Sequence, residues 1–326
     1  MPDQAQGLRA LMTRARGNTA VSAVPQETSE LADAAVVYDT RPTTRCQPPS
    51  LTRVIAVTSG KGGVGKTNFS SNLALALVQA GKRVMVVDAD LGLANLHVIL
   101  GINPPYTLGH VMRGEKNLDE TIFTGPLGLK VLAGASGMTE LANLDSARRD
   151  CFLEQIVDLD RAAEIILLDT GAGVSDNVAA FLSAAREVII VTTPEPTALT
   201  DAYATIKVIS RQGGDVDLKL VVNMANNEVE ARAVAERLTS ISRRFLNIEL
   251  KSLGFVPYDQ TVPKSVRAQY PFLLSNANSA AAQAIVKIAG KLISAEDGST
   301  SGAGLADMLQ RMSRFFQRRT AAGDRL

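Results

Sequence analysis

A glycine-rich stretch at residues 59–67, with the sequence SGKGGVGKT, most strongly limits what this chain can fold into. An apolar run at residues 54–57 precedes the stretch, and apolar residues at helical spacing follow it at residues 69–78. A strand, a glycine-rich turn and a helix in this order are the context in which phosphate-binding loops occur. The stretch also fits the pattern G-x-x-x-x-G-K-[ST] of such a loop. It therefore predicts a phosphate-binding turn; the alternative is a glycine turn without a nucleotide.

The residue types in the loop indicate how it would hold a nucleotide. Glycines let backbone N–H groups converge on phosphate oxygens, and the N-terminus of the following helix adds its positive end. Lys66 is expected to reach the β- and γ-phosphates, and the Thr67 hydroxyl to bind Mg²⁺. The residues expected to contact the nucleotide here are Gly60, Lys61, Gly62, Gly63, Val64, Gly65, Lys66, Thr67 and Asn68.

Length and composition set the outer limits of the prediction. The 326 residues allow one large α/β domain with tails, or two small domains. A formal net charge of +1 gives no global attraction for nucleic acid, so we expect no direct nucleic-acid partner. Cys46 and Cys151 have no metal-like spacing, which is typical of a reducing cytosol. No segment resembles a membrane span or a signal peptide.

Residues 51–293 alternate between strand and helix signals. Near-continuous Val, Ile and Leu strands between helices predict a mostly parallel, doubly wound sheet covered on both faces, with ligands at the carboxyl ends of the strands. The predicted strands are 54–57, 83–88, 129–132, 165–169, 187–192, 218–223 and 253–256. The predicted helices are 69–78, 91–100, 147–159, 176–185, 197–212, 229–244 and 279–292.

Two tails flank this domain. Residues 1–16 predict a short helix that is marginal alone and is either frayed or used against a partner, and residues 17–50 predict a flexible linker. A second linker at 294–303 precedes residues 304–326, where apolar residues at helical spacing accompany Arg311, Arg314, Arg318 and Arg319. This cationic amphipathic pattern favours an anionic membrane surface. The alternative is a terminal helix packed on the core.

Carboxylates follow two of the predicted strands. Asp88 and Asp90 end one strand, and burying both without partners is costly. We expect Asp90 to orient the attacking water, and Asp88 to lie near the metal or to support the loop; the alternative is a helix cap. Asp169 ends a very apolar strand and matches the carboxylate that holds Mg²⁺ through water. The alternative for Asp169 is a simple strand-end cap.

Two further strand ends are candidates for the adenine site. Asn223 ends a predicted strand and is expected to hydrogen-bond the adenine edge. Pro257, Tyr258 and Asp259 end the next strand and are expected to form the other wall. An ordinary turn explains these residues nearly as well.

A second lysine in the loop, Lys61, is not required by the general pattern. Phosphoryl transfer depends on positioning and on stabilisation of charge, and the sequence offers no evident arginine finger. A flexible ammonium at the outer edge of the loop is a candidate for that role. If Lys61 points away from its own nucleotide, it would serve the ATP of a second subunit.

With Lys61 and Lys66 both present, the loop resembles the deviant Walker A motif of the MinD/ParA group of ATPases, and the resemblance covers about residues 51–292. It implies that Lys61 reaches across a homodimer that encloses ATP. The switch I aspartate maps to Asp90, and the Walker B or switch II aspartate maps to Asp169. Residues 192–203 look like the MinD-type branch.

The tails narrow the resemblance. Asp3-Gln4-Ala5, with Leu8-Arg9, looks like the activator segment of the FlhG/FleN flagellar-number regulators, which stimulates the GTPase FlhF. Residues 256–272 and the C-terminal helix are similar to the same family. The resemblance implies an ATP- and Mg²⁺-dependent dimerising ATPase that controls flagellum number and placement. Its implied partners are an FlhF-type GTPase, a flagellar transcription activator and an anionic membrane; its implied location is the cytoplasm, and the inner face of the membrane when ATP is bound.

Three alternatives stay open. One is a MinD-type ATPase of the division site, which would not need the N-terminal helix. Another is a ParA-like partition ATPase, which needs a basic surface and salt-sensitive DNA binding. The last is a nucleotide-sensing scaffold with negligible turnover.

Overall fold

Of the 326 residues, the computed structural model describes 52–90, 95–134, 155, 163–211, 216–294, 304, 307–312 and 314. The strands among them are β1 Arg53–Ser59, β2 Val84–Ala89, β3 Ile122–Thr124, β4 Lys130–Leu132, β5 Ile165–Ala172, β6 Glu187–Thr192, β7 Asp217–Ala225 and β8 Leu250–Pro257. These described strands form one eight-stranded sheet in the order β3-β4-β2-β5-β1-β6-β7-β8. Neighbours run parallel except β3 and β4, which are antiparallel.

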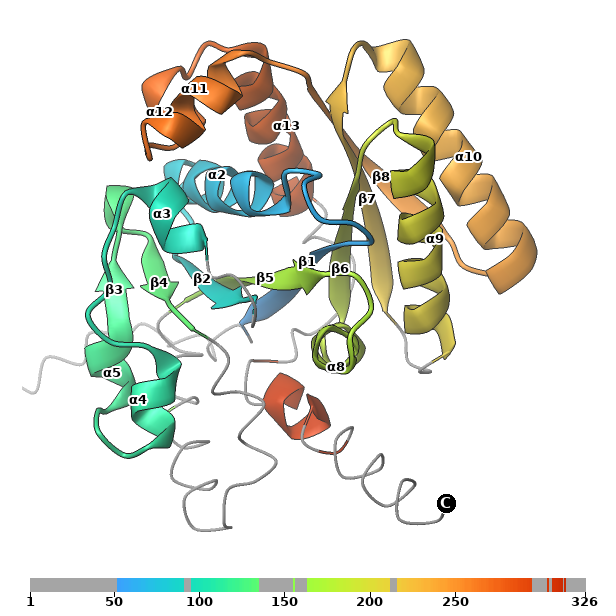
Figure 1. The fold of residues 1–326 in the computed structure, drawn as a ribbon. Helices are drawn as coiled ribbons and strands as arrows, with labels where there is room; N and C mark the ends of the chain where they lie inside the picture. The colour runs from blue at the N-terminus through green and yellow to red at the C-terminus, as the bar shows by residue number, and fades with distance from the viewer. Residues whose placement is uncertain are drawn as a thin grey trace, which may run out of the picture. The chain divides into compact units, whose positions relative to one another are not determined.

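Helices cover both faces of the sheet (Figure 1). The helices of the described residues are α2 Lys66–Gln79, α3 Leu96–Leu100, α4 Leu108–Met112, α5 Leu118–Thr121, α8 Asp176–Ala184, α9 Pro196–Arg211, α10 Glu228–Leu246, α11 Thr261–Arg267, α12 Phe272–Ser275 and α13 Ala280–Ser294, with a short 3₁₀ turn η1 at Pro126–Gly128. The prediction of a mostly parallel, doubly wound α/β fold is confirmed.

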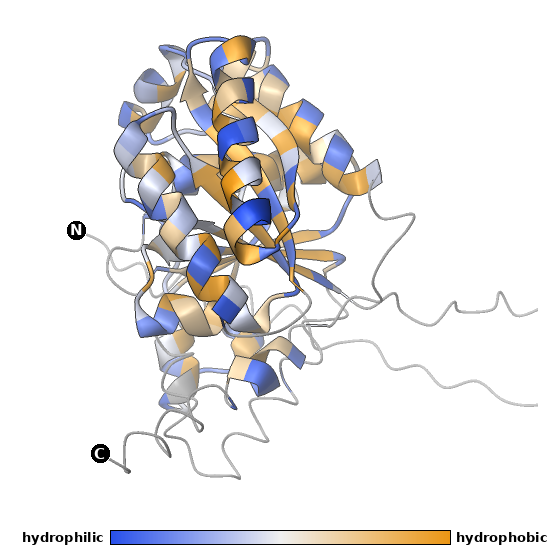
Figure 2. Cartoon of the chain, turned by 90° about the vertical axis from the view of Figure 1, so that its right-hand side faces the viewer, coloured by the Kyte–Doolittle hydropathy of each residue, from blue (hydrophilic) through white to orange (hydrophobic). Residues whose placement is uncertain are grey.

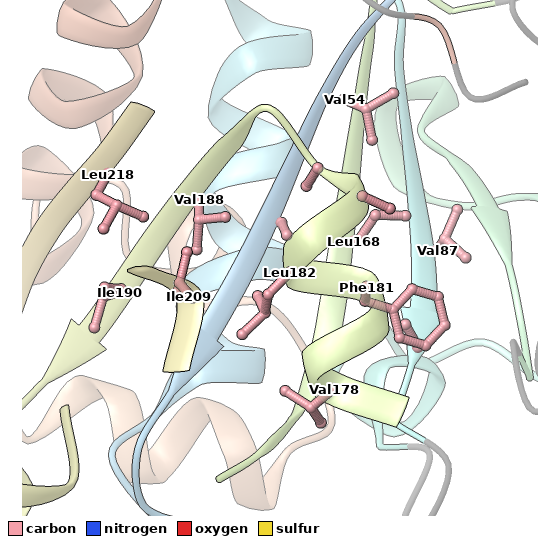
Figure 3. Packing of buried hydrophobic residues seen from close by; sticks show 14 of the residues in the cluster. Val54, Val87, Leu168, Val178, Phe181, Leu182, Val188, Ile190, Ile209 and Leu218 are labelled. Atoms are coloured by element: carbon pink, nitrogen blue, oxygen red, sulfur yellow. The ribbon is translucent and has the colours of Figure 1, made fainter. Parts of the chain in front are cut away.

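The alternation of side chains along each strand divides the core into two parts. On β1, Val54 and Ala56 join one buried cluster, whereas Ile55 and Val57 join the other. The first cluster packs under α8, α9 and α10, and the second packs under α2 and α13. Figure 3 shows side chains of α8, including Phe181, lying over the strands, and Figure 2 shows hydrophobic residues along the interior strands. Because both faces are covered, the central strands are apolar at almost every position.

Local signals explain where the long helices begin. Ser175 precedes α8, and its hydroxyl accepts a hydrogen bond from the N–H of Val178. Asn227 caps α10 in the same way by accepting from the N–H of Glu230. Such caps satisfy amide groups that have no partner inside the helix. These caps hold the loops that lead from β5 to α8 and from β7 to α10, and both loops lie at the carboxyl ends of the strands.

The predicted strands and most predicted helices appear within a few residues of their expected ends. The predicted helix at 91–100 begins at Leu96 in the described residues, and the predicted helix at 147–159 lies outside them apart from residue 155. The sequence pattern did not predict β3, α4, α5, α11 or α12. Each of these elements has seven residues or fewer, too few for a periodic pattern to become clear.

The described part of the C-terminal segment packs on the core. Met308, Leu309 and Met312 are each 1% exposed and belong to the buried cluster that includes α8. Asp307 lies 3.9 Å from the guanidinium of Arg186, just beyond α8. For these residues the structure therefore shows the packed alternative, and membrane binding stays a prediction. In the described part of the chain, no helix is both long enough and apolar enough to cross a membrane. The N-terminal helix, the linker at 17–50 and residues 295–303 lie outside the described residues.

Candidate nucleotide site

The glycine-rich loop joins β1 to α2 and depends on close backbone contacts. Gly65 precedes α2 with φ +83°, a conformation that favours glycine, and a Cβ there would lie 2.5 Å from the side-chain nitrogen of Asn223. At Gly60 a Cβ would lie 2.1 Å from the backbone carbonyl carbon of Asp201 in α9. These two glycines are therefore required because the loop is pressed against β7 and α9.

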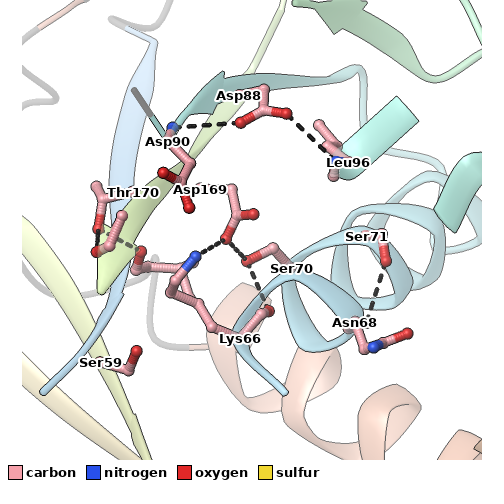
Figure 4. A network of polar contacts seen from close by, with 12 residues as sticks. Ser59, Lys66, Asn68, Ser70, Ser71, Asp88, Asp90, Leu96, Asp169 and Thr170 are labelled. Atoms are coloured by element: carbon pink, nitrogen blue, oxygen red, sulfur yellow. Dashed lines mark hydrogen bonds and ion pairs between the residues drawn. The ribbon is translucent and has the colours of Figure 1, made fainter. Parts of the chain in front are cut away.

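Lys66 and Asp169 form a buried pair at the centre of the site (Figure 4). The Lys66 ammonium lies 3.1 Å from Asp169 Oδ1, and the two side chains are 7% and 1% exposed. The hydroxyl of Ser70, one turn along α2, donates to the same oxygen over 2.8 Å. The pair balances one positive and one negative charge where neither is well solvated. Contact of Lys66 with phosphates stays a prediction.

Asp88 lies beside Asp169, since the two residues are paired in the register of β2 and β5. Its carboxylate accepts hydrogen bonds from the N–H groups of Asp90, over 3.2 Å, and of Leu96, over 3.3 Å. Burial and the neighbouring charge of Asp169 raise the pKa of Asp88 to about 6, against the effect of these two bonds. In this structure Asp88 supports the ends of the segment between residues 90 and 96.

Asp90 faces the carboxyl end of β5. A Cβ added at Gly171 would lie 3.4 Å from Asp90 Oδ1, and the two residues line one cavity together with the start of α8. The loop after β5 is tied to the glycine-rich loop, because the N–H of Gly173 donates to the carbonyl of Ser59 over 2.8 Å. The structure thus brings Lys66, Asp88, Asp90 and Asp169 together, as the sequence predicted. Their catalytic roles stay predictions.

Mg²⁺, which the loop pattern implies, fits the donors present. Oδ2 of Asp169 is buried and has no hydrogen-bond partner among the described residues. An unpaired buried carboxylate oxygen is costly, and Mg²⁺ prefers oxygen ligands. Thr67 follows Lys66 in the first turn of α2 and is half-buried. The ligand roles of Thr67, Asp88 and Asp169 stay predictions.

The four residues predicted for the adenine site meet in one mostly apolar cavity. Its lining also contains Gly65, Asn68, Phe69, Met224, Val256, Val262, Pro263, Phe272 and Ile285. Asn223 donates from its amide to the carbonyl of Val64 over 2.8 Å, so it also holds the glycine-rich loop. Both oxygens of Asp259 are already used, by Thr261 and by the N–H of Ala281. Pro257 and Tyr258 also line this cavity, and contact of any of the four residues with adenine stays a prediction.

Lys61 is the exception to this gathering of charged residues. Its ammonium lies 2.8 Å from a carboxylate oxygen of Glu195 and 3.2 Å from the hydroxyl of Thr197, both beyond β6. The Lys61 side chain is 40% exposed, in contrast to Lys66. The two lysines of the loop are therefore held by different elements and in different surroundings.

Comparison with known proteins shows the family of this chain. Residues 55–272 match the family model described as the CobQ/CobB/MinD/ParA nucleotide binding domain. The antiactivator FleN of Pseudomonas aeruginosa is 41% identical over 240 residues, which cover 74% of this chain and 86% of FleN. The flagellum site-determining protein YlxH of Helicobacter pylori is 40% identical over 247 residues, covering 74% of this chain and 82% of YlxH. The chain belongs to the MinD/ParA family of nucleotide-binding ATPases, in its FleN/FlhG branch.

Solved structures of the family support the fold assignment. The septum site-determining protein MinD of Pyrococcus horikoshii, complexed with Mg-ADP, superimposes with a TM-score of 0.61 at 25% identity. The match covers 76% of this chain and 98% of that protein. The MinD/ParA-type domain supports binding of a nucleotide and Mg²⁺. The donors around Lys66 and Asp169 are compatible with both.

Sequence reasoning missed several side chains of this MinD/ParA-type site. Ser70 lies four residues after Lys66 on one helix face, so helical periodicity was a signal for it. Met224, with φ +57°, lines the same cavity as Asn223. Glu195 and Thr197 were noticed only as part of the segment 192–203 that resembles the MinD-type branch. Nothing in the sequence indicated their contact with Lys61, because 134 residues separate Lys61 from Glu195.

Proposed function

We propose that this chain is an ATP-dependent dimerising switch that controls flagellum number and placement. The observation that supports it most directly is the position of Lys61. Lys66 is buried with Asp169, whereas Lys61 is 40% exposed and bound to an exposed glutamate. A cation at the mouth of a phosphate site, held away from that site, is available to the phosphates of a second copy.

Each residue of the site has a role in this proposal. Lys66 leaves Asp169 for the β- and γ-phosphates, and the amide groups of the loop hold the same phosphates. Thr67 and, through water, Asp169 would hold Mg²⁺, which would neutralise phosphate charge. Asp90 orients the attacking water, while Asp88 keeps the backbone of residues 90 and 96 in place. Lys61 from the second copy supplies the charge of an arginine finger.

The biological output rests on the relatives. FleN is named an antiactivator, and YlxH is named a flagellum site-determining protein. We propose the same kind of output for this chain, through an FlhF-type GTPase bound by residues 1–16 and through a flagellar transcription activator. The cytoplasmic monomer and a membrane-bound dimer are the two states of the switch.

Because the C-terminal segment packs on the core, its transfer to a membrane requires free energy to release it. Met308, Leu309 and Met312 are buried in the core, so they must leave it before they can enter lipid. Burying one such side chain in the core stabilises the folded state by about 1.5–3 kcal/mol. Membrane binding by a single weak anchor returns little more free energy than this release costs. A dimer has two anchors, and avidity strengthens their combined binding. ATP-driven pairing thus favours the membrane-bound state.

A first experiment measures ATPase activity against protein concentration. Wild type should show a specific rate that rises with concentration, since only the dimer turns over. Lys61→Ala should lose about 10³-fold or more in rate, the usual contribution of an arginine finger. Lys66→Ala should be inactive at every concentration, and Lys287→Ala, an exposed lysine on α13, should behave as wild type. A concentration-independent rate contradicts the dimer, and no turnover at all favours the scaffold alternative.

Two further experiments test the output. Liposome co-sedimentation with ATP should recover wild type but not Lys61→Ala; equal binding by both would overturn the coupling of dimer and membrane. Deletion of residues 1–16 should abolish stimulation of the FlhF-type GTPase and leave the ATPase rate intact. Stimulation that survives the deletion would show that residues 1–16 are not the activating segment. A full-length chain that does not stimulate the GTPase favours the MinD-type division role, and salt-sensitive DNA binding with ATP favours the ParA-like role.

A further inference from the structure

Two helices that are distant in sequence contribute to the mostly apolar cavity beside Asn223, called the base cavity below. Asn68 and Phe69 on α2 line it, and so does Phe272, the first residue of α12. The two helices are in contact, and Figure 1 shows α12 beside α2. The position of α12 against α2 therefore helps to set the width of the base cavity.

The short helix α12 depends on partners outside itself. It has only four residues, and a helix of one turn is unstable in water without packing or caps. The first N–H groups of any helix have no acceptor inside that helix. Pro271 precedes α12 and offers no side-chain cap. The N–H of Leu273, in the first turn, thus needs an acceptor from another element.

Asn72 on α2 supplies this acceptor. Its Oδ1 accepts a hydrogen bond from the N–H of Leu273 over 2.9 Å, across 201 residues of chain. Its Nδ2 donates to the carbonyl of Asn68 over 2.8 Å. Asn72 is 0% exposed, so neither bond competes with water. One buried amide group therefore joins the backbone of Asn68 to the residue that follows Phe272.

We propose that Asn72 is a positioning residue for the nucleotide base. It caps α12 from α2 and so holds Asn68 and Phe272 at the separation that the flat base requires. Asn72 is not among the described residues that line the base cavity, so it acts through these two neighbours. The inference rests on the adenine site of the proposed function and assigns that site a residue from behind its wall.

This role separates the base from the phosphates. Asn72→Leu keeps a similar volume but leaves the buried N–H of Leu273 without an acceptor, which is costly. The helix α12 then shifts or frays, and binding of the base must restore it. The phosphates are held by the glycine-rich loop and Lys66 in the proposed function, and neither contacts α12 in the described residues. Loss of Asn72 should therefore weaken binding of the base and not of the phosphates.

The decisive experiment compares Mg-ADP with Mg-pyrophosphate, which lacks the base, on full-length wild type and Asn72→Leu by titration calorimetry. The dissociation constant of Mg-ADP should rise about 5-fold or more, and that of Mg-pyrophosphate should not change. In ATPase assays the KM for ATP should rise by the same factor with kcat unchanged. Circular dichroism shows that each variant is folded at the temperature used.

Thr52→Val is the matched control. The Thr52 hydroxyl is buried and donates to the carbonyl of Ala163 over 2.9 Å, across 111 residues of chain. This bond lies at the amino end of β1, whereas the nucleotide site lies at the carboxyl ends of the strands. Thr52→Val should lower the melting temperature without changing the affinity for either ligand.

Three results would contradict the inference in different ways. Equal weakening of Mg-ADP and Mg-pyrophosphate, or a fall in kcat, would show that Asn72 supports α2 as a whole and not the base. A wild-type preference for ADP that Asn72→Leu retains overturns only the role of Asn72. A wild type that binds ADP no more tightly than pyrophosphate overturns the adenine site of the proposed function, and the inference with it.

Hydrogen exchange of the Leu273 amide tests the same role in wild type, without any variant. The amide should exchange slowly in the free protein because Asn72 is its acceptor. Mg-ADP should slow the exchange further, since the base presses on the adjacent Phe272, whereas Mg-pyrophosphate should not. Rapid exchange in the free protein, or equal slowing by both ligands, overturns the positioning role.

Discussion

Two buried lysine–carboxylate pairs lie at opposite ends of the parallel strands. They differ in how many of their charged atoms have a hydrogen-bond or ion-pair partner. At the amino ends of the strands, Lys219 contacts Glu187 at 2.7 Å and also Asp217, and Glu187 receives two further bonds from Arg53. At the carboxyl ends, Lys66 contacts one oxygen of Asp169, and the other oxygen has no partner among the described residues.

The charges reflect this difference. Burial alone would raise the pKa of Glu187, but the hydrogen bonds and charges of Arg53 and Lys219 outweigh it and hold the pKa below its usual range. Asp88, beside Asp169, has no such cation among the described residues, and burial raises its pKa to about 6. A closed network of this kind stabilises a fold, whereas an open one is unfavourable until a ligand completes it. The comparison distinguishes structural from functional charge in one sheet.

The largest effect is expected from opening the closed network. Glu187→Gln leaves Arg53 and Lys219 with less negative charge than they need in a buried site. We expect the free energy of unfolding to fall by about 3–5 kcal/mol, measured by urea denaturation. The ATPase rate of the folded protein should not change. Unchanged stability of Glu187→Gln, or a loss of ATPase activity without a loss of stability, would show that the network at the amino ends of the strands is not mainly structural.

A smaller and pH-dependent effect is expected at the open edge. The raised pKa of Asp88 means that its charged form destabilises the native state, so wild type loses stability as pH rises from about 4 to about 6. Without nucleotide or Mg²⁺, Asp88→Asn should raise the free energy of unfolding at pH 7.5 by roughly 1–3 kcal/mol. The gain should shrink below pH 6 and vanish near pH 4 in thermal melts. If Asp88→Asn raised the free energy of unfolding equally at every pH, the charge of Asp88 would not be the cause.

The smallest effect is expected at the rim of the closed network. Lys251 lies 2.9 Å from Asp217 but is 56% exposed, so water screens the pair. Lys251→Ala should lower the free energy of unfolding by less than about 1 kcal/mol, and added salt should reduce the loss further. A loss of stability as large as that of Glu187→Gln would show that the exposed Lys251–Asp217 pair contributes as much as the buried part of the network.

Much of the sheet was predictable because its signals are local. The apolar runs that became β5 and β6 are long and bounded by polar residues, and parallel strands of this kind need little context to be recognised. The short elements α4, α5, α11 and α12 were missed because too few residues repeat in each. The C-terminal segment shows the limit of a pattern: an apolar face at helical spacing predicts burial, but not whether lipid or the core covers it.

The sequence alone determined the phosphate-binding loop and the meeting of Lys66, Asp88, Asp90 and Asp169. These residues stand at the carboxyl ends of parallel strands or in the loop after one, and such ends share one edge of the sheet. Only the tertiary structure decided which side chains bind which partners. Asn223 holds Val64 across 159 residues of chain, and Glu195 holds Lys61 across 134. The physical reason is that periodicity fixes the face of an element on which a side chain lies, whereas its partner depends on packing between elements that are distant in sequence.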